Sequence, residues 1–222
     1  MIEARALDPT KVRDIAPLVL DEGGRLKVMP AAFYEGTTVE ERAIFGVRHA
    51  AYGLPTLELV AWLKALIGDR PALEIGAGTG VLSDALGIIG TDNLMQQWPH
   101  IRAHYAALRQ PVIAYGANVR QYDAVDAVCA LKPKVVVASW VTHKYDPARH
   151  EAGGNEHGVV EEEIIRNCET YVVIGNTHVH RAKSVWSLPH TLLHPSWLYS
   201  RAHNGSREFI AVWGKYAPWR AA

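Results

Sequence analysis

The stretch with the clearest chemical potential is PALEIGAGTG, residues 71–80, in which an apolar run meets a carboxylate and then three glycines. Glu74 stands two residues before the first glycine. Glycine tolerates positive φ and lets another group approach the backbone closely, so such a turn can hold a ligand. The dinucleotide fingerprint Gly-x-Gly-x-x-Gly would need glycine where this chain has Val81. The adjacent carboxylate therefore favours a cationic or hydroxyl-rich ligand over a diphosphate.

Two further carboxylates follow expected strands. Asp92 closes the segment IIGTD, and Asp123 follows the segment VRQY. Ligands of open α/β sheets bind outside the carboxyl ends of the strands, where both residues would lie. Asp92 could accept hydrogen bonds from both ribose hydroxyls or cap the next helix, and Asp123 could contact the ligand or only cap its helix. If Asp92 serves the ligand alone, Asp92→Ala weakens binding and hardly changes the melting temperature of the ligand-free protein.

Polar side chains also follow the two most apolar segments, KVVVASWV and TYVVIG. A histidine that is neutral near pH 7 can take a proton from a nucleophile, although it could equally contact substrate or lie in a surface loop. These segments supply the candidate catalytic residues His143, Tyr145 and Asn176 and the candidate substrate contacts Thr142 and His178. His178 and His180 would share one face of an extended segment, but no third ligand has an obvious spacing, so no metal site is predicted.

Alternating helices and strands must position these residues, which predicts a mostly parallel α/β sheet. Strands are expected at 72–75, 88–92, 134–141 and 170–175, and the third strand at 119–122, with 112–115 as the alternative. Helices are expected within 37–53, 54–71, 80–87, 93–110 (with a break at Pro99), 124–131 and 159–168. Thr56 and Asp123 are plausible helix N-caps. Two β-rich runs around Asn204-Gly205 predict a terminal antiparallel hairpin.

In these segments the chain resembles the class I S-adenosylmethionine-dependent methyltransferases. The resemblance rests on LEIGAGTG, IIGTD, QYDAV and VVVASWV, and it extends over residues 57–213. It implies a Rossmann-like class I methyltransferase fold: a mostly parallel seven-stranded sheet with a C-terminal antiparallel hairpin, here after an N-terminal helical extension. The expected division is 1–56 for the extension, which would cover the cofactor, and 57–222 for the cofactor-binding domain.

The resemblance also implies the cofactor, S-adenosylmethionine, and the residues that hold it. The glycine turn would pack against the amino-acid part of the cofactor, Asp92 would hold the ribose, and Asp123 with Ala124 would lie near the adenine. Trp140 would form a wall of the site or serve only as a packing residue. The expected cofactor contacts are Glu74, Gly76, Ala77, Gly78, Thr79, Gly80, Asp92, Asp123, Ala124 and Trp140.

The expected reaction is methyl transfer to a nitrogen or oxygen of an acceptor, a small molecule rather than DNA. The fourth strand lacks the Asn/Asp-Pro-Pro-Tyr/Phe segment of amino-methylating DNA enzymes, and no cysteine follows a proline. Lysine plus arginine balances aspartate plus glutamate, 23 against 23, so no large nucleic-acid footprint is indicated. Three alternatives stay open: a catalytically silent module or partner subunit that keeps the cofactor pocket, an NAD(P)-dependent oxidoreductase, and an enzyme that uses the same cofactor for other chemistry.

Hydropathy predicts a cytoplasmic protein without a membrane partner. The first residues have no apolar core of a signal peptide, and no apolar run is long enough to span a bilayer. The loop within 147–158 contains HEAGGNEHG, which could be a lid over the site or a variable insertion.

Overall fold

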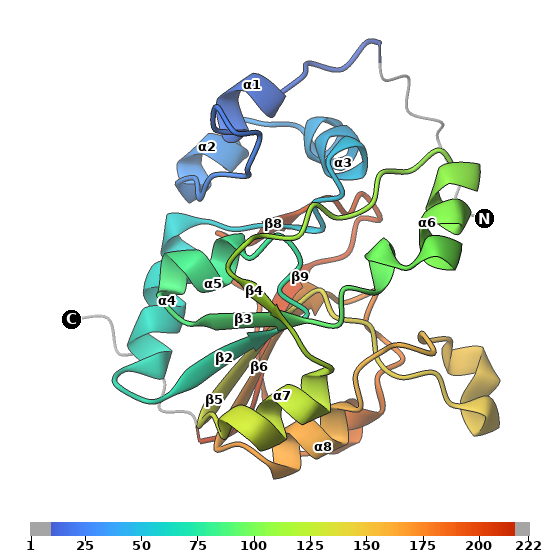
Figure 1. Ribbon diagram of the computed structural model, residues 1–222. Helices are drawn as coiled ribbons and strands as arrows, with labels where there is room; N and C mark the ends of the chain where they lie inside the picture. Colours follow the sequence, from blue (N-terminus) through green and yellow to red (C-terminus); the bar gives the residue numbers. More distant parts are fainter. Residues whose placement is uncertain (1–9, 216–222) are drawn as a thin grey trace.

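A seven-stranded sheet forms the centre of the computed structural model, which describes residues 10–215 (Figure 1). The strand order is β4-β3-β2-β5-β6-β9-β7. The first five strands in this order run parallel, and β9 runs antiparallel to both β6 and β7. The strands are β2 Ala72–Ile75, β3 Ile89–Asp92, β4 Val119–Gln121, β5 Val135–Ser139, β6 Thr170–Asn176, β7 Thr191–Leu193 and β9 Glu208–Gly214. The fold class expected from the sequence is confirmed.

Helices cover both faces of the sheet (Figure 1). One face packs against α4 Leu57–Ile67 and α5 Val81–Leu86, and the other against α7 Ala124–Leu131 and α8 Glu161–Arg166. Strand β5 is apolar throughout because alternate residues serve the two cores: Val135 and Val137 face α4, and Val136 faces α7. The sequences of β5 and β6 lack alternating polar residues, and this pattern correctly indicated a sheet covered by helices on both faces.

Most local expectations are confirmed. The third strand is β4, at 119–121, and not the segment 112–115. The hydroxyl of Thr56 accepts a hydrogen bond from the backbone N–H of Leu59 and caps α4. The break at Pro99 separates two helices, η1 Met95–Gln97 and α6 Pro99–Ala107. Two further short helices are η2 Pro147–Ala152 and η3 Ser184–Ser187.

The N-terminal extension contains three helices, α1 Ala16–Val19, α2 Ala31–Glu35 and α3 Val39–Arg48, but more than half of its described residues lie outside them, so it is less helical than expected. Thr38 and Glu41 form a capping box at the start of α3. The extension has a small core of its own, which contains the buried Tyr34 and packs against Tyr199 of the C-terminal segment. A two-stranded sheet, β1 Gly53–Leu54 with β8 Tyr199–Ser200, fastens the extension above the central sheet. The division of the chain at residue 56 stays a prediction.

The terminal hairpin around Asn204-Gly205 is a wrong prediction. The turn exists, with Gly205 at φ 72°, but its flanking strands belong to different sheets. Strand β8 pairs with β1 of the extension, and β9 pairs with β6 and β7. The antiparallel edge of the sheet is therefore present, but it is formed by β9 and β7. Strand β8 pairs with β1, which is distant in sequence, and not with its sequence neighbour β9.

No helix among residues 10–215 is both long enough and apolar enough to cross a bilayer.

Candidate functional site

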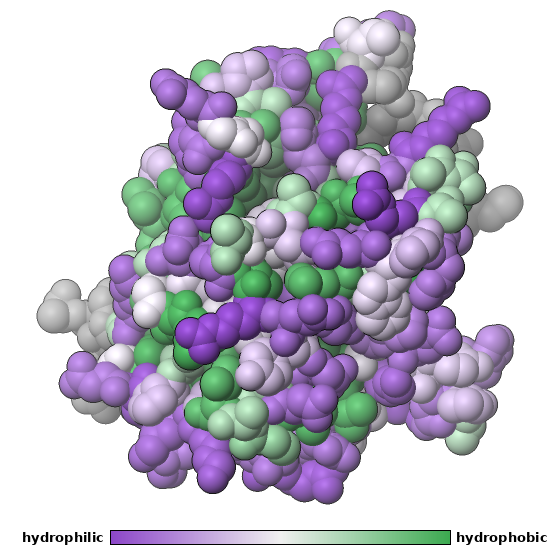
Figure 2. Space-filling view, in the orientation of Figure 1, coloured by the Kyte–Doolittle hydropathy of each residue, from purple (hydrophilic) through white to green (hydrophobic). Residues whose placement is uncertain are grey.

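A cavity of about 720 Å³ lies between the extension and the carboxyl edge of the central sheet. The chain order reverses between β2 and β5, which is the point where ligands bind in open α/β sheets. The wall of the cavity is formed by the loops after β2, β3, β4 and β5, by residues 20–26 and 45–55 of the extension, and by the start of β9. In the orientation of Figure 1, Figure 2 shows apolar residues near the centre of the molecule with polar residues around them.

The glycine turn after β2 forms one wall of the cavity. Gly76, Gly78 and Gly80 all have positive φ, at 61°, 52° and 70°. A Cβ on Gly76 would lie 2.7 Å from Cγ1 of Val141, so this position has neither the conformation nor the space for a side chain. Residues 76–79 line the cavity, whereas Gly80 opens α5 outside the lining. Four of the five turn residues expected to contact a cofactor therefore face the cavity.

Glu74 is buried beneath this turn, with 2% of its surface exposed, and it also lines the cavity. Its Oε2 accepts a hydrogen bond of 2.8 Å from the backbone N–H of Ser83 in α5. Burial raises the pKa of Glu74 to about 8, against the favourable hydrogen bonds from Ser83. A buried carboxyl group of this kind gains most from a cationic ligand, which favours its ionised form.

The raised pKa of Glu74 predicts a pH-dependent contribution to stability. Between the ordinary pKa of 4.5 and about 8, the folded protein holds a proton that the unfolded chain has released. The free energy of unfolding of the wild type should therefore fall relative to that of Glu74→Gln as pH rises from 5 to 8, by roughly 3–4 kcal/mol. Urea titrations of both proteins across this range measure the difference. A difference that is constant with pH would show that Glu74 is ionised throughout.

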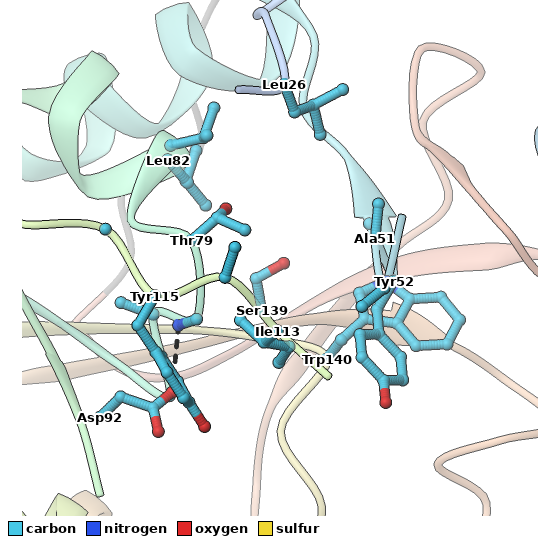
Figure 3. Close-up of a pocket in the computed structure, with 18 of the residues that line it drawn as sticks. Leu26, Ala51, Tyr52, Thr79, Leu82, Asp92, Ile113, Tyr115, Ser139 and Trp140 are labelled. Carbon is cyan, nitrogen blue, oxygen red and sulfur yellow. Dashed lines mark hydrogen bonds between the residues drawn. The ribbon is translucent and has the colours of Figure 1, made fainter. Parts of the chain in front are cut away.

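Asp92, at the end of β3, lines the cavity and braces the glycine turn. Its Oδ2 accepts a hydrogen bond of 3.0 Å from the N–H of Gly78, and its Oδ1 accepts one of 2.9 Å from the N–H of Leu94. Figure 3 shows Asp92 next to Tyr115, and its dashed line to the carboxylate is the bond from the N–H of Gly78. Burial raises the pKa of Asp92, and the bonds from Leu94 and Gly78 oppose that shift. Asp92 is thus a structural group as well as a candidate ligand contact.

The remaining candidate cofactor contacts also line the cavity. Asp123 caps α7, because its Oδ1 accepts a hydrogen bond from the N–H of Val125, and both Asp123 and Ala124 face the cavity. Trp140 and the candidate substrate contact Thr142 belong to the turn after β5, which lines the cavity as well. Trp140 has φ of 62°, which is rare for a large side chain and marks this turn as locally strained.

Besides Gly80, four predicted residues do not line the cavity: His143, Tyr145, Asn176 and His178. Asn176 is fully buried; its amide donates to Ser206 and Glu208, and its Oδ1 accepts from two backbone N–H groups and from Asn204. Tyr145 contacts His150 through its hydroxyl, at 2.9 Å from Nδ1.

The two histidines among them lie elsewhere for different reasons. The backbone of His143 bridges to Val159, the side chain of His143 does not line the cavity, and burial lowers the pKa of its ring. His178 is exposed, whereas His180 is buried with Nδ1 against the backbone of Asn176, so the two do not share a face. Among residues 10–215, no three His, Cys, Asp or Glu side chains are grouped as a metal site.

The loop within 147–158 contributes to the site through its second half. Asn155 and His157 line the cavity, and the amide of Asn93 donates to the backbone carbonyl of His157 at 3.3 Å. The second half of the loop runs back along the segment that follows β5, where the N–H of Asn155 donates to the carbonyl of His143. These bonds attach the loop to the wall of the cavity near the end of β5. A lid over the site and a variable insertion were the two expectations for this loop, and its position is that of a lid.

Several lining residues had no signal in the sequence. Tyr52 and Tyr105 both line the cavity, and burial together with the neighbouring Tyr52 hydroxyl raises the pKa of Tyr105 to about 12. Tyr52 comes from the extension, and its ring lies 6.4 Å from that of Trp140 (Figure 3). Glu208 lines the cavity from the first position of β9. For Glu208 the sequence offered one signal, because Glu208 is a charged residue at the start of an otherwise apolar strand.

A buried ion pair supports the strained turn from behind. Nζ of Lys183 lies 2.6 Å from Oε2 of Glu161 and donates a hydrogen bond of 3.0 Å to the carbonyl of Val141. The hydroxyl of Tyr171 donates to the other oxygen of Glu161 at 2.8 Å. All three side chains are essentially inaccessible to solvent. The pair therefore fixes the carbonyl that directly follows Trp140 in the cavity wall.

Comparisons with known proteins give similar structures only. No family model matches the chain, and no curated protein matches it. Similar solved structures include the precorrin-8w decarboxylase of Methanobacterium thermoautotrophicum, at 14% identity and a TM-score of 0.40 over 75% of this chain and 94% of that chain. Another is the precorrin-6y C5,15-methyltransferase of Geobacter metallireducens, at 15% identity and 0.39 over 72% and 89%.

A third is the magnesium protoporphyrin IX methyltransferase of Synechocystis with bound SAM, at 15% identity and a TM-score of 0.38 over 70% of this chain and 76% of that chain. Likenesses of this extent carry no argument about function. The fold class rests instead on the strand order and register of the central sheet.

Proposed function

We propose that this protein is an S-adenosylmethionine-dependent methyltransferase that acts on a small-molecule acceptor. The observation that carries the proposal is the pairing of a buried carboxyl group, Glu74, with a glycine turn at positive φ, both facing one cavity at the reversal of strand order. The motif-level resemblance assigns this arrangement to the amino-acid part of the cofactor, and Asp92 follows on the neighbouring strand, where a ribose would lie.

The residues of the cavity fit the cofactor in kind. Glu74 offers a buried carboxyl group to a ligand that carries positive charge, and the open backbone of Gly76 and Gly78 allows close approach. Each oxygen of Asp92 accepts a hydrogen bond from one backbone N–H, and Tyr115 also interacts with the carboxylate. Because a carboxylate oxygen can accept more than one hydrogen bond, Asp92 can also accept from a ligand hydroxyl. Asp123 and Ala124 lie on the same wall, one strand further along, as an adenine site requires.

The extension favours a small acceptor over DNA. Residues from 20–26 and 45–55 close over the cavity, and its volume lies within the range of about 300–1,000 Å³ that is typical of small-molecule sites. Bound S-adenosylmethionine supplies an activated methyl group on its sulfonium. The protein contributes alignment of the acceptor with that group and exclusion of water. His143 and Tyr145 lie outside the cavity lining and have no assigned part in this reaction.

Turnover tests the proposal against its alternatives. Incubation with S-adenosylmethionine and a broad panel of small amines and phenols should yield S-adenosylhomocysteine and products heavier by one methyl group, measured by mass spectrometry. Cofactor binding without turnover on any acceptor would identify a silent module, and a product without an added methyl group would identify other cofactor chemistry. A thermal shift with NADH and none with S-adenosylmethionine would replace the proposal by an oxidoreductase.

A further inference from the structure

The carboxyl group of Glu208 projects from the central sheet into the cavity because β9 is antiparallel. In such a strand the first residue lies at the carboxyl edge of the parallel strands, and Glu208 pairs in register with Asn176, the last residue of β6. Its Oε1 accepts hydrogen bonds from the hydroxyl of Ser200, at 2.7 Å, and from the amide of Asn176, at 3.2 Å. Two neutral donors thus fix one oxygen of a largely buried carboxyl group.

The other oxygen of Glu208 has no protein partner within residues 10–215. No donor bonds Oε2, and the side chain takes part in none of the ion pairs of the described residues. Arg42 influences Glu208 electrostatically, but its Nη1 donates to Thr37 and to the carbonyl of Tyr34. Among the described residues no cation contacts this carboxyl group, and burial raises its pKa against the opposing influence of Arg42.

Two aromatic residues, Tyr52 and Trp140, line the same cavity as this carboxyl group. The backbone of Gly53 packs on the indole of Trp140, since a Cβ there would lie 3.1 Å from Cδ1, and Gly53 pairs with Ser200, which bonds Glu208. Tyr52 precedes Gly53 and lies along the same wall as Trp140 (Figure 3). The guanidinium of Arg201 covers one face of the Tyr52 ring, with Cζ 3.7 Å from the ring centroid, so a ligand can pack only on its other face and on Trp140. Aromatic faces attract ammonium groups and also stack on planar rings.

We propose that the end of the cavity between β1, the turn 139–141 and β9 binds an amine carried on an aromatic ring, with Glu208 as the group that binds the amino nitrogen. This inference rests on the proposed function, because it identifies this end of the cavity with the methyl-acceptor site. An ammonium group satisfies the free oxygen of Glu208, and the ring of the ligand packs on Tyr52 and Trp140. A carboxylate ligand of the same shape meets like charge at Glu208 and is rejected.

Calorimetry on protein saturated with S-adenosylhomocysteine tests the inference without turnover. 2-Phenylethylamine should bind about 10-fold or more tightly than 3-phenylpropanoate, which keeps the ring and chain but carries a carboxylate, and more tightly than butylamine, which lacks the ring. Glu208→Gln should remove the preference for the amine over the carboxylate and leave the affinity for S-adenosylhomocysteine unchanged. Tyr52→Leu should remove the preference for phenylethylamine over butylamine.

Glu163→Gln is the matched control, because it makes the same change in net charge at an exposed position of α8, on the opposite face of the sheet. It should keep both preferences. Equal affinity of the wild type for the amine and the carboxylate, or retention of the preference in folded Glu208→Gln, would overturn this inference while the proposed function stands. Absence of S-adenosylhomocysteine binding to the folded wild type would overturn both.

Discussion

Lys183→Met is expected to lower the free energy of unfolding by about 3–5 kcal/mol, the cost of leaving one member of a buried ion pair without its partner. The substitution removes the cation 2.6 Å from Glu161 and the donor to the carbonyl of Val141, in a region that water does not reach. Methionine is close to lysine in length, so the loss arises from charge and hydrogen bonding and not from a cavity. Equilibrium urea unfolding measures this change.

Two further variants separate the buried pair from a general effect of lysine. Lys134 forms an ion pair with Glu169 on the surface, with 54% of its side chain exposed, so Lys134→Met should cost less than about 1 kcal/mol. Lys183→Met combined with Glu161→Gln should recover part of the loss, because no unpaired charge stays buried and the amide can still accept from Tyr171. Equal small losses for Lys183→Met and Lys134→Met would contradict the buried network.

Asp92→Ala is expected to have two effects, one on folding and one on binding. Without its carboxylate, the N–H groups of Gly78 and Leu94 lose their partners, and the protein should lose about 2–4 kcal/mol of stability. Because Asp92 bonds Gly78 and Leu94, we expect a loss of stability in place of the almost unchanged melting temperature that the sequence alone predicted. Loss of the ribose contact and of the braced turn should also weaken S-adenosylhomocysteine binding by about 10-fold or more.

Asp123→Ala is the comparison for stability, because Asp123 satisfies one backbone N–H at an exposed helix start. It should cost about 1 kcal/mol, as helix N-caps commonly do. Thermal and urea unfolding of both ligand-free variants, followed by calorimetry, give the two effects separately. If Asp92→Ala is no less stable than Asp123→Ala and binds like the wild type, Asp92 has neither role.

The sequence predicted those parts of the fold and site that depend on local pattern. The apolar strands β5 and β6, the glycines at positive φ, and the carboxylates Glu74 and Asp92 all follow from spacing within a few residues. The alternation of strands and helices then placed these residues at one edge of the sheet.

The parts that were missed depend on contacts between distant segments. Asn176 follows the expected strand but turns to bond the C-terminal segment, and Glu208 reaches the cavity only because β9 reverses direction. The terminal hairpin failed for the same reason, since β1 of the extension takes β8 as its partner. His143 lies outside the cavity lining, in a segment whose backbone pairs with Val159 of the following loop, and its catalytic role stays a prediction. No periodicity or motif in the sequence encodes these pairings.

The most direct test of the central claim is calorimetry of the folded wild type with S-adenosylmethionine, S-adenosylhomocysteine and NADH, supported by mass spectrometry of any ligand that co-purifies. Micromolar binding of one or both S-adenosyl compounds, about −8 kcal/mol, with no heat from NADH, is the expected result. Folded protein that binds neither S-adenosyl compound, after removal of any co-purified ligand, would contradict the assignment of the cavity formed by Glu74, the glycine turn and Asp92.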